Sequence, residues 1–470
     1  MGAVTVSVSA WTRADRPRLS TLILASSVGT YLLILSGVSN ALAGTGGTCP
    51  GWPLCETAWL GSLEAALVMG HRTAAATVGV LLLVTVAVAF RREVAQQTRL
   101  ALVAAGVLFP FEVLVGARVA GAGVSTSIAT LHLVTAMLVF SALMAGFIWR
   151  FQAEPPAPST PTTATAERSA GSAREEATMQ QPGAIGVALA YLRLTKPALW
   201  WLLGLVALAS MALAANGVPP LDRTVATISG GVLAIGASGT FNNVLERDRD
   251  QHMARTADRP VATSVIPPRR ALAFGFGLLG VSMAVFLAYV NVLAAGLGLL
   301  AVVFYSVIYT LVLKPNTVWN TVVGGAVGAL PALIGWVAVR ESIGVPAVVL
   351  GTVVVLWAPA HFYNLALVYK AEYARAGFPM LPVVRGEATT RRHVAGFLAA
   401  TLLATILLGT VQPLGAIFAG TAVVLGATFL YAVQRLERRR TDRAAMRTFL
   451  AANLYLGGLL VAIMVETMIV

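Results

Sequence analysis

Thirteen apolar runs, each long enough to cross a lipid bilayer, recur along this sequence. A transmembrane α-helix needs about 20 consecutive, mainly apolar residues. The first four runs lie at 20–42, 67–90, 100–120 and 127–149. The other nine lie at 197–216, 224–245, 271–290, 293–313, 318–339, 345–369, 393–411, 414–434 and 448–469. This pattern predicts an all-α polytopic membrane protein with a four-helix bundle followed by a nine-helix bundle.

The composition excludes a soluble domain with a polar surface. Hydrophobic residues make up 57% of the chain and charged residues only 11%, so too little charge remains to cover such a surface. The net charge of +13 could suggest a nucleic-acid partner, but the basic residues are concentrated in alternate loops. Those loops lie at 13–18, 91–99, 247–270, 370–392 and 435–447.

By the positive-inside rule the basic loops are cytoplasmic. We therefore expect a multi-pass cell-membrane protein with a cytoplasmic N-terminus, an outer C-terminus and no nucleic-acid partner. The first apolar run ends in "NALAG", which could pass for a signal-peptide cleavage site. Its length and the matching helix that follows favour a retained span.

The chain divides once, at residues 151–189. This segment is rich in Pro, Ala, Ser and Thr, and it has no sustained apolar period. Such a composition is typical of a disordered linker. We expect a four-helix membrane unit at 1–150, a cytoplasmic linker at 151–189 and a nine-helix unit at 190–470.

One stretch, "NNVLERDRDQHMARTADRP" at 242–260, holds an unusual density of charge for so apolar a chain. If the preceding helix continues, Asn242, Glu246 and Asp250 form one stripe on its face. Carboxylate and amide oxygens suit Mg²⁺, which prefers few carboxylates plus a phosphate. Arg255 and Arg259 could grip the phosphate oxygens. The alternative is an ordinary charged loop, and in both cases we expect the carboxylates at a solvated helix end that supports no core.

A second loop of similar type is "HFYNLALVYKAEYARAGFPMLPVVRGE" at 361–387. Its acid is Glu372, and it lies at the same predicted face of the membrane. Two acidic loops that meet over one cavity could clamp a diphosphate between two metal sites.

These residues resemble the intramembrane prenyltransferases of the UbiA superfamily, and specifically the protoheme IX farnesyltransferases. The resemblance covers about residues 190–470. It rests on four stretches in order: "LTKPALW" at 194–200, the acidic stretch at 242–260, "LKPNTVWNTVVGGAVGALPALIGW" at 313–336, and "YARAGFPMLPVV" at 373–384. It implies Mg²⁺-dependent transfer of a farnesyl group from farnesyl diphosphate to a vinyl group of heme B, which gives heme O.

The resemblance also implies residue roles. Asn242, Glu246, Asp250 and Glu372 would be catalytic, and the three acids among them would hold Mg²⁺. The diphosphate would contact Lys196, Arg255, Arg259 and Lys314. Glu246 stands where the family usually has Asp, and Ala371 with Glu372 stands where many members have two adjacent Asp residues.

Two alternatives to heme farnesylation stay open at this point. One is another UbiA-type transferase acting on an aromatic, quinone or chlorophyll acceptor, and the other is a nonenzymatic heme-binding membrane protein. His361 has two interpretations as well, a heme contact or a hydrogen-bonded histidine between helices.

The four-helix unit carries its own pattern. His71 and His132 lie near the starts of the second and fourth helices, which run in the same direction, so both imidazoles are expected near the outer surface as bis-histidine heme ligation requires. Cys49 and Cys55 lie on the outer side, where a disulfide can persist, and no further soft ligand is available for zinc.

The stretches "TCPGWPLC", "MGHR" and "LHLVTA" resemble one half of heme A synthase, over about residues 20–150. This implies a heme-handling unit, with a separate heme A synthase as a partner. The acid that the family places three residues before the first histidine is Val68 here. The alternative is a degenerate or scaffolding unit.

Overall fold

The computed structural model describes residues 19–42, 49, 51–54, 62–121, 126–150 and 183–469. It divides the chain into two compact units, Met1–Ala153 and Glu154–Val470. All regular secondary structure in the described residues is helical, and thirteen of their helices are long and apolar enough to cross a membrane, four in the first unit and nine in the second. The prediction of an all-α polytopic membrane protein is confirmed.

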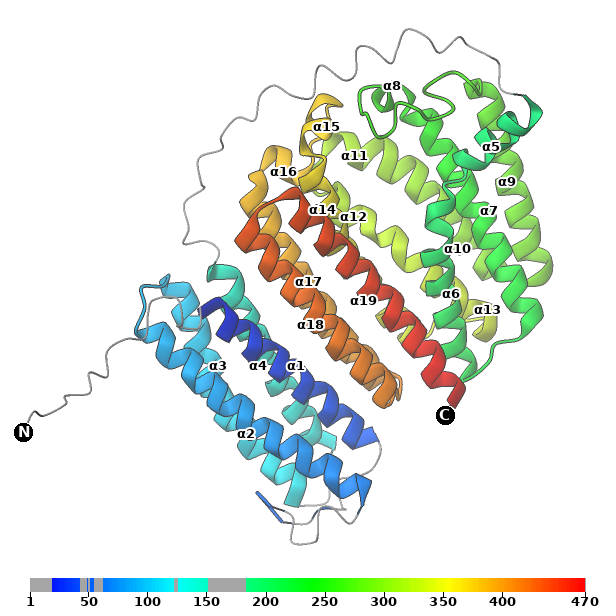
Figure 1. The fold of residues 1–470 in the computed structure, drawn as a ribbon. Helices are drawn as coiled ribbons and strands as arrows, with labels where there is room; N and C mark the ends of the chain where they lie inside the picture. The colour runs from blue at the N-terminus through cyan, green and yellow to red at the C-terminus, as the bar shows by residue number, and fades with distance from the viewer. Residues whose placement is uncertain are drawn as a thin grey trace, which may run out of the picture. The chain divides into compact units, whose positions relative to one another are not determined.

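The first unit is a bundle of α1 (Leu19–Leu42), α2 (Leu63–Phe90), α3 (Gln96–Gly121) and α4 (Thr126–Arg150) (Figure 1). Each helix contacts the next along the chain, and α1 also contacts α4. Short connections between consecutive helices make neighbours antiparallel. The helices α2 and α4 therefore run in one direction and lie diagonally across the bundle.

The second unit contains nine membrane-spanning segments and several short helices. The segments before the middle of the unit are α5 (Ala184–Leu194), α6 (Trp200–Ala215), α7 (Leu221–Leu245), α8 (Arg247–Asp250), α9 (Pro268–Tyr289), α10 (Val292–Val303), a π-helix (Phe304–Leu313) and α11 (Lys314–Asn316). The remainder are α12 (Asn320–Gly324), a 3₁₀ turn (Gly325–Ala329), α13 (Leu330–Arg340), α14 (Val345–Val368), α15 (Lys370–Arg375), α16 (Leu381–Val384), α17 (Gly386–Val411), α18 (Ala416–Arg439) and α19 (Asp442–Ile469).

The structure differs from the predicted linker at its end. Residues 151–182 lie outside the described part of the chain, but 184–189 belong to α5. The sequence "AIGVALAYLRL" is apolar enough to form a short helix, and its buried Ala190 and Leu194 join a small core with Val261, Ile266 and Ala271. This helix therefore anchors the loop that follows α8.

Close helix contacts hold the second unit together. The pairs α7–α9, α14–α17, α18–α19 and α6–α13 are all in direct contact. At Gly335 in α13, a Cβ atom would lie 2.2 Å from the backbone oxygen of Ala207 in α6. Only glycine lets these two backbones approach so closely.

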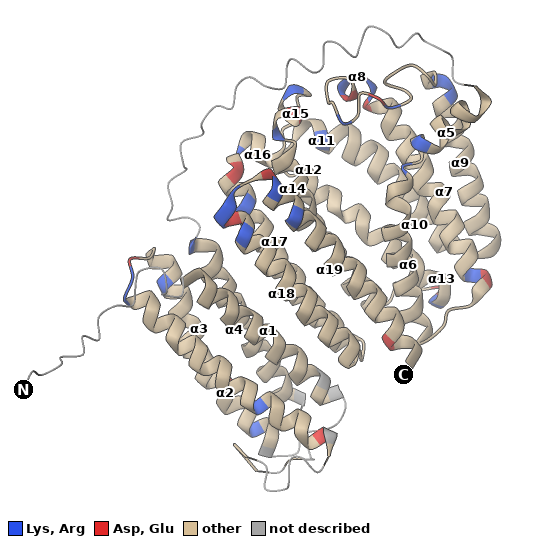
Figure 2. Cartoon of the chain, viewed as in Figure 1, with Lys and Arg blue, Asp and Glu red and all other residues tan. Residues whose placement is uncertain are grey.

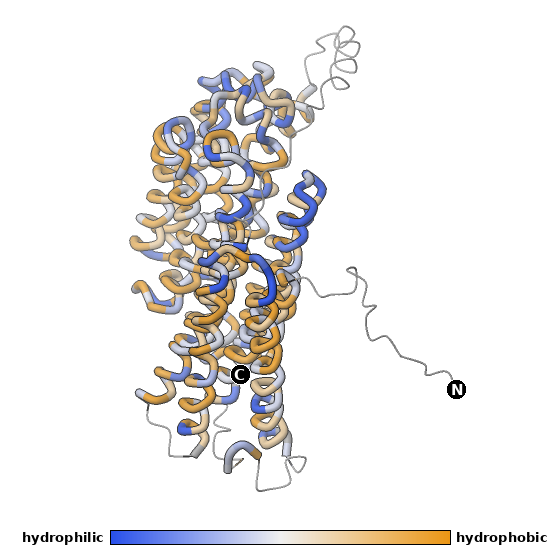
Figure 3. The backbone as a smooth tube through the Cα atoms, turned by 90° about the vertical axis from the view of Figure 1, so that its left-hand side faces the viewer, coloured by the Kyte–Doolittle hydropathy of each residue, from blue (hydrophilic) through white to orange (hydrophobic). Residues whose placement is uncertain are grey.

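Charge and hydropathy separate along the helices of the second unit. Lys and Arg gather around α8, α15, α16 and the α18–α19 turn, at one end of this unit (Figure 2). Apolar residues follow the lengths of the helices (Figure 3), as expected for segments that face lipid. The candidate site lies at the charged end.

Candidate active site

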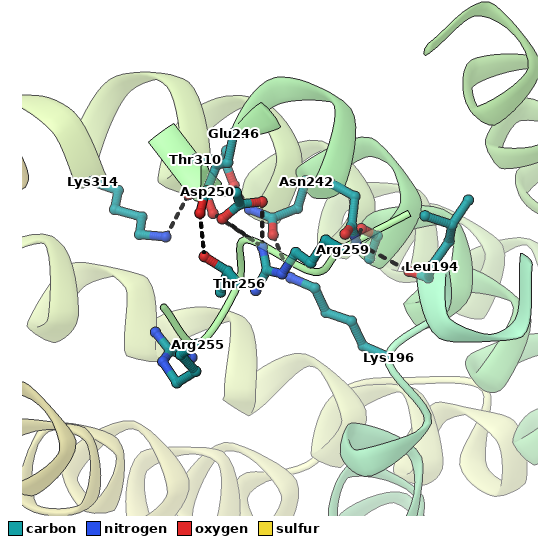
Figure 4. Close-up of polar contacts among 12 residues, drawn as sticks. Leu194, Lys196, Asn242, Glu246, Asp250, Arg255, Thr256, Arg259, Thr310 and Lys314 are labelled. Carbon is teal, nitrogen blue, oxygen red and sulfur yellow. Dashed lines mark hydrogen bonds and ion pairs between the residues drawn. The ribbon is translucent and has the colours of Figure 1, made fainter. Parts of the chain in front are cut away.

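The acidic stripe forms as helical geometry predicts, because the hydrogen-bonding pattern of α7 continues into α8. The backbone nitrogen of Glu246 donates to the Asn242 oxygen at 2.9 Å, and that of Asp250 donates to the Glu246 oxygen at 2.8 Å. Three oxygen-bearing side chains therefore share one face (Figure 4). Asp248 lies off this face, and its side chain is 81% exposed beside Arg247.

The expectation that these acids lie at a solvated helix end is wrong. Asn242, Glu246 and Asp250 are only 1%, 2% and 0% exposed. Cationic side chains cover them, Arg259 from the same loop and Lys196 and Lys314 from distant segments. Burying a carboxylate costs free energy unless it is paired and hydrogen-bonded. These acids can therefore be buried only because cationic side chains pair with them.

Cations from three separate segments contact the stripe (Figure 4). Lys314 Nζ, at the start of α11, lies 2.5 Å from Glu246 Oε1. Arg259 Nη1 donates to both oxygens of Asp250, at 2.7 and 2.9 Å, and lies 3.9 Å from Glu246 Oε2. Lys196 donates to Asn242 Oδ1. Three of the four cations suggested by the family resemblance therefore meet at the stripe.

Burial and these cations act in opposite directions on the two acids. Burial tends to raise the pKa of Glu246, but Lys314 and Lys196 outweigh it, so its pKa lies below the usual range. For Asp250 burial prevails over Arg259, and its pKa is raised. The stripe thus combines a firmly ionised carboxylate with one that is easier to protonate.

Lys196 lies in the turn before α6 and adopts a left-handed backbone conformation, with φ of 51°. Few non-glycine residues adopt this conformation, and such residues cluster at functional sites. Burial, followed by the charge of Arg259, lowers the pKa of Lys196 to about 8.

Two further contacts come from the π-helix, a type of segment that is frequent at functional sites. Tyr305 Oη lies 3.2 Å from Lys196 Nζ, and Asn242 Nδ2 donates to Thr310 Oγ1 at 3.1 Å. Neither residue could be identified from the sequence, because tyrosine and threonine are common within apolar helices.

The second acidic loop contacts the first. Arg255 Nη2 lies 3.3 Å from Tyr373 Oη, and its guanidinium lies 5.2 Å from the centre of the Tyr369 ring. Lys314 Nζ in turn lies 4.5 Å from the centre of the Phe378 ring. The fourth cation, Arg255, therefore joins the two loops, and within the described residues its contacts are with Tyr369 and Tyr373 rather than with the acidic stripe.

Glu372, on α15, differs from the acids of the first loop. Its Oε2 atom is buried and has no hydrogen-bond partner within the described residues. The described residues also contain no group of three or more His, Cys, Asp or Glu side chains placed to hold a metal. Glu246, Asp250 and Glu372 therefore do not form the three-acid metal site that the family resemblance implied. Any metal site here must combine few carboxylates with other oxygen ligands.

His361 lies in the interface between α14 and α19. Its ring stacks between Trp357 and Phe449, with centroid distances of 4.4 and 4.2 Å, and it is 5% exposed. None of its contacts within the described part of the chain is with the acidic stripe. This environment corresponds to the interhelical interpretation of His361.

In the first unit, both histidines have polar partners. His71 Nδ1 lies 2.9 Å from Ser36 Oγ, and His132 Nδ1 lies 2.7 Å from Glu112 Oε1. Glu112 was missed by the sequence analysis, although a lone acid inside an apolar run is itself a signal.

The loop before α2 is held by the residue next to His71. Arg72 donates to the backbone oxygens of Cys49 and Gly51, at 3.0 and 2.8 Å. Cys49 is disulfide-bonded. Cys55, the only other cysteine of the sequence, lies outside the described residues.

Two family models match separate parts of the chain. The UbiA prenyltransferase family model matches residues 202–456, and a cytochrome oxidase assembly protein model matches residues 62–180. The solved structure of a digeranylgeranylglyceryl phosphate synthase covers 60% of this chain and 99% of its own, with a TM-score of 0.52 and 14% identity. At that identity it shows only a shared fold.

Relatives of similar length share much more sequence. A protoheme IX farnesyltransferase from Haloarcula marismortui is 47% identical over 97% of this chain and 99% of its own length. Protoheme IX farnesyltransferase 1 from Natronomonas pharaonis is 49% identical over 96% of this chain and 99% of its own. The chain therefore belongs to the UbiA prenyltransferase family, among the protoheme IX farnesyltransferases.

Proposed function

We propose that this protein transfers the farnesyl group of farnesyl diphosphate to a vinyl group of heme B, which gives heme O. The observation that carries the proposal is the buried stripe of Asn242, Glu246 and Asp250, with Lys196, Arg259 and Lys314 in contact with it. Relatives of this chain that match it over nearly their full lengths are named protoheme IX farnesyltransferases.

The donor chemistry of the site fits Mg²⁺. Glu246, Asp250 and the amide of Asn242 supply oxygen atoms. Mg²⁺ takes oxygen ligands and commonly uses only one or two carboxylates together with substrate phosphates. When bound, Mg²⁺ supplies positive charge that stabilises the leaving diphosphate.

The cations of the site would bind and orient the diphosphate. Lys196, Arg259 and Lys314 already converge on one face of α7 and α8, and Arg255 lies where the two loops meet. Charge-assisted hydrogen bonds from such side chains to phosphate oxygens are strong, and they stabilise the charge that develops as the bond to the farnesyl carbon breaks.

The surroundings of the site would protect the reacting carbon. Tyr305 and Tyr309 stack at 5.6 Å beside the stripe, and Phe378 is buried beneath Lys314. Excluding water matters because water would compete with the vinyl carbon for the allylic cation.

The decisive experiment supplies purified protein in membranes with heme B, farnesyl diphosphate and Mg²⁺, then identifies products by mass. Formation of heme O supports the proposal. Farnesylation of a quinone or aromatic acceptor with heme B untouched would favour another UbiA-type transferase. Heme binding with no consumption of farnesyl diphosphate would favour the nonenzymatic alternative.

We also propose that the charged end of the second unit faces the cytoplasm of a cell-membrane protein, with a cytoplasmic N-terminus. The support is the positive-inside rule applied to its Lys and Arg residues. Single cysteines introduced at Arg249, in α8, and at Ser342, between α13 and α14, lie at opposite ends of the spans and test this by their labelling in intact cells. The heme O formed would then pass to a separate heme A synthase.

A second candidate function belongs to the first unit. We propose that His71 and His132 bind heme, because they lie on the diagonal helices α2 and α4, each in an early turn. Paired histidines on facing helices are a common way for a bundle to hold a cofactor. Heme added to the full chain should give a low-spin spectrum that His71→Ala and His132→Ala each abolish. Cys49→Ser acts only on the outer loop and should weaken binding rather than abolish it.

A further inference from the structure

The two histidines of the first unit are held in the same way, through Nδ1. For His71 the partner is a hydroxyl. Ser36 Oγ lies 3.0 Å from the Leu33 backbone oxygen and 2.9 Å from His71 Nδ1. When Ser36 donates its hydrogen to Leu33, it can accept one from Nδ1 of His71, and that tautomer leaves a lone pair on Nε2.

The partner of His132 is a carboxylate rather than a hydroxyl, and it favours the same tautomer. Glu112 reaches from α3 to place Oε1 2.7 Å from His132 Nδ1, an ion-pair distance without the alignment of a hydrogen bond. A carboxylate offers only acceptors, so it favours the tautomer of His132 with hydrogen on Nδ1, because a bare ring nitrogen there would face the anion with its lone pair. Within the described residues, neither Nε2 atom has a hydrogen-bond partner.

Glycines complete both arrangements. A Cβ atom at Gly37 would lie 3.2 Å from Cε1 of His71, and one at Gly116 would lie 2.8 Å from Cε1 of His132. Gly37 follows Ser36 directly, and Gly116 lies one helical turn after Glu112. Each ring thus rests against a glycine next to the residue that binds its Nδ1.

We infer that Ser36 and Glu112 are positioning residues that fix both imidazoles with Nε2 available to one heme iron, and that they make the two ligands unequal. The inference rests on the heme site proposed above. A carboxylate partner raises the basicity of a ligating histidine more than a hydroxyl does, because it carries a full negative charge. His132 is then the stronger donor and His71 the weaker one.

The test uses the full chain loaded with heme B, with the electronic spectrum and the midpoint potential as readouts. Glu112→Gln keeps an acceptor of the same shape but removes the charge, so the spectrum should remain low-spin while the potential becomes more positive. Ser36→Ala removes a neutral partner, so it should shift the potential less. We expect Ser36→Ala to weaken heme affinity about 10- to 100-fold, which is the usual effect of removing a residue that hydrogen-bonds to a metal ligand.

Glycine variants provide a second, independent measurement. Gly116→Ala should displace His132 and lower heme affinity, since the new Cβ would overlap its ring. Gly70→Ala is the matched control, because Gly70 is the neighbour of His71 and a Cβ there meets no atom of the described residues within 4 Å. It should bind heme as the parent does.

The outcomes separate the inference from the heme site itself. A parent chain with no low-spin heme overturns both. A parent with low-spin heme whose potential is the same in Glu112→Gln and in the parent leaves the heme site standing and overturns the role of Glu112. Prenyl transfer, measured on the same samples, reports separately on the second unit.

Discussion

Lys314 Nζ and Glu246 Oε1 lie 2.5 Å apart and join the start of α11 to the end of α7. Arg259 makes the corresponding contact with Asp250. The side chains proposed to bind the diphosphate are thus bound to the side chains proposed to bind the metal. Each carboxylate must exchange a cationic partner for a metal ion, and each freed cation can then bind a phosphate oxygen.

This arrangement predicts that metal and diphosphate bind cooperatively. Mn²⁺, as a spectroscopic substitute for Mg²⁺, should bind weakly alone and at least about tenfold more tightly with pyrophosphate, a coupling of about 1.4 kcal/mol. Lys314→Met frees Glu246 from its cation, so it should bind the metal alone more tightly and pyrophosphate less tightly. Equal Mn²⁺ affinity with and without pyrophosphate in the parent would contradict the exchange.

Glu246→Gln and Asp250→Asn should each reduce heme O formation by more than about 100-fold, beyond the usual effect of altering only the surroundings of a metal ligand. Both amides keep the shape of the buried side chain. Because removing one partner of a buried ion pair can cost about 3–5 kcal/mol, thermal unfolding in detergent must be measured alongside activity. Asp248→Asn is the matched control, since Asp248 is exposed and lies off the stripe. Near-parental activity of either stripe variant would refute the assignment.

The pH dependence of the reaction should report Lys196. Its pKa is lowered to about 8 by burial, so the side chain is cationic below that pH and neutral above it. A neutral amine cannot supply the positive charge that the diphosphate needs, so kcat/KM for farnesyl diphosphate should fall as pH rises through about 8. Lys196→Arg, which stays charged, should lose this limb of the profile. A profile that falls identically in the variant would assign the limb to another group.

The stripe could be predicted from the sequence because Asn242, Glu246 and Asp250 are four residues apart, and helix geometry alone places them on one face. Their burial could not be predicted. It depends on Lys196 and Lys314, which are 46 and 68 positions away from their partners. Only the family resemblance had connected those lysines with the site.

The remaining surprises have the same origin. Tyr305 and Glu112 each lie within an apolar helix, where a single polar residue has no periodic pattern to indicate its partner. The number of spans was predicted correctly because it depends only on local hydropathy. Contacts between helices far apart in the sequence depend on the tertiary fold.

A chain that begins at Gly183 should retain prenyl transfer. Every residue of the proposed prenyl site lies in the second unit, and α5, which anchors the loop after α8, begins at Ala184. The shortened and full chains should give similar kcat and KM in the same membranes. Normal insertion of the shortened chain without activity would show that the first unit contributes to the prenyl site.

His361→Phe should preserve both stability and heme O formation, because phenylalanine can keep the stack between Trp357 and Phe449. His361→Ala should be destabilised by roughly 3–5 kcal/mol, the usual cost of removing a buried aromatic ring. The loss of the imidazole nitrogens alone should cost only the one hydrogen bond to the Phe449 backbone, about 1 kcal/mol, since Nδ1 already lacks a hydrogen-bond partner among the described residues. Thermal unfolding in detergent reports a role of His361 in packing between the helices, and the KM for heme B reports a role in heme contact. A His361→Phe protein that is stable but has a strongly raised KM for heme B would show that His361 contacts the heme after all.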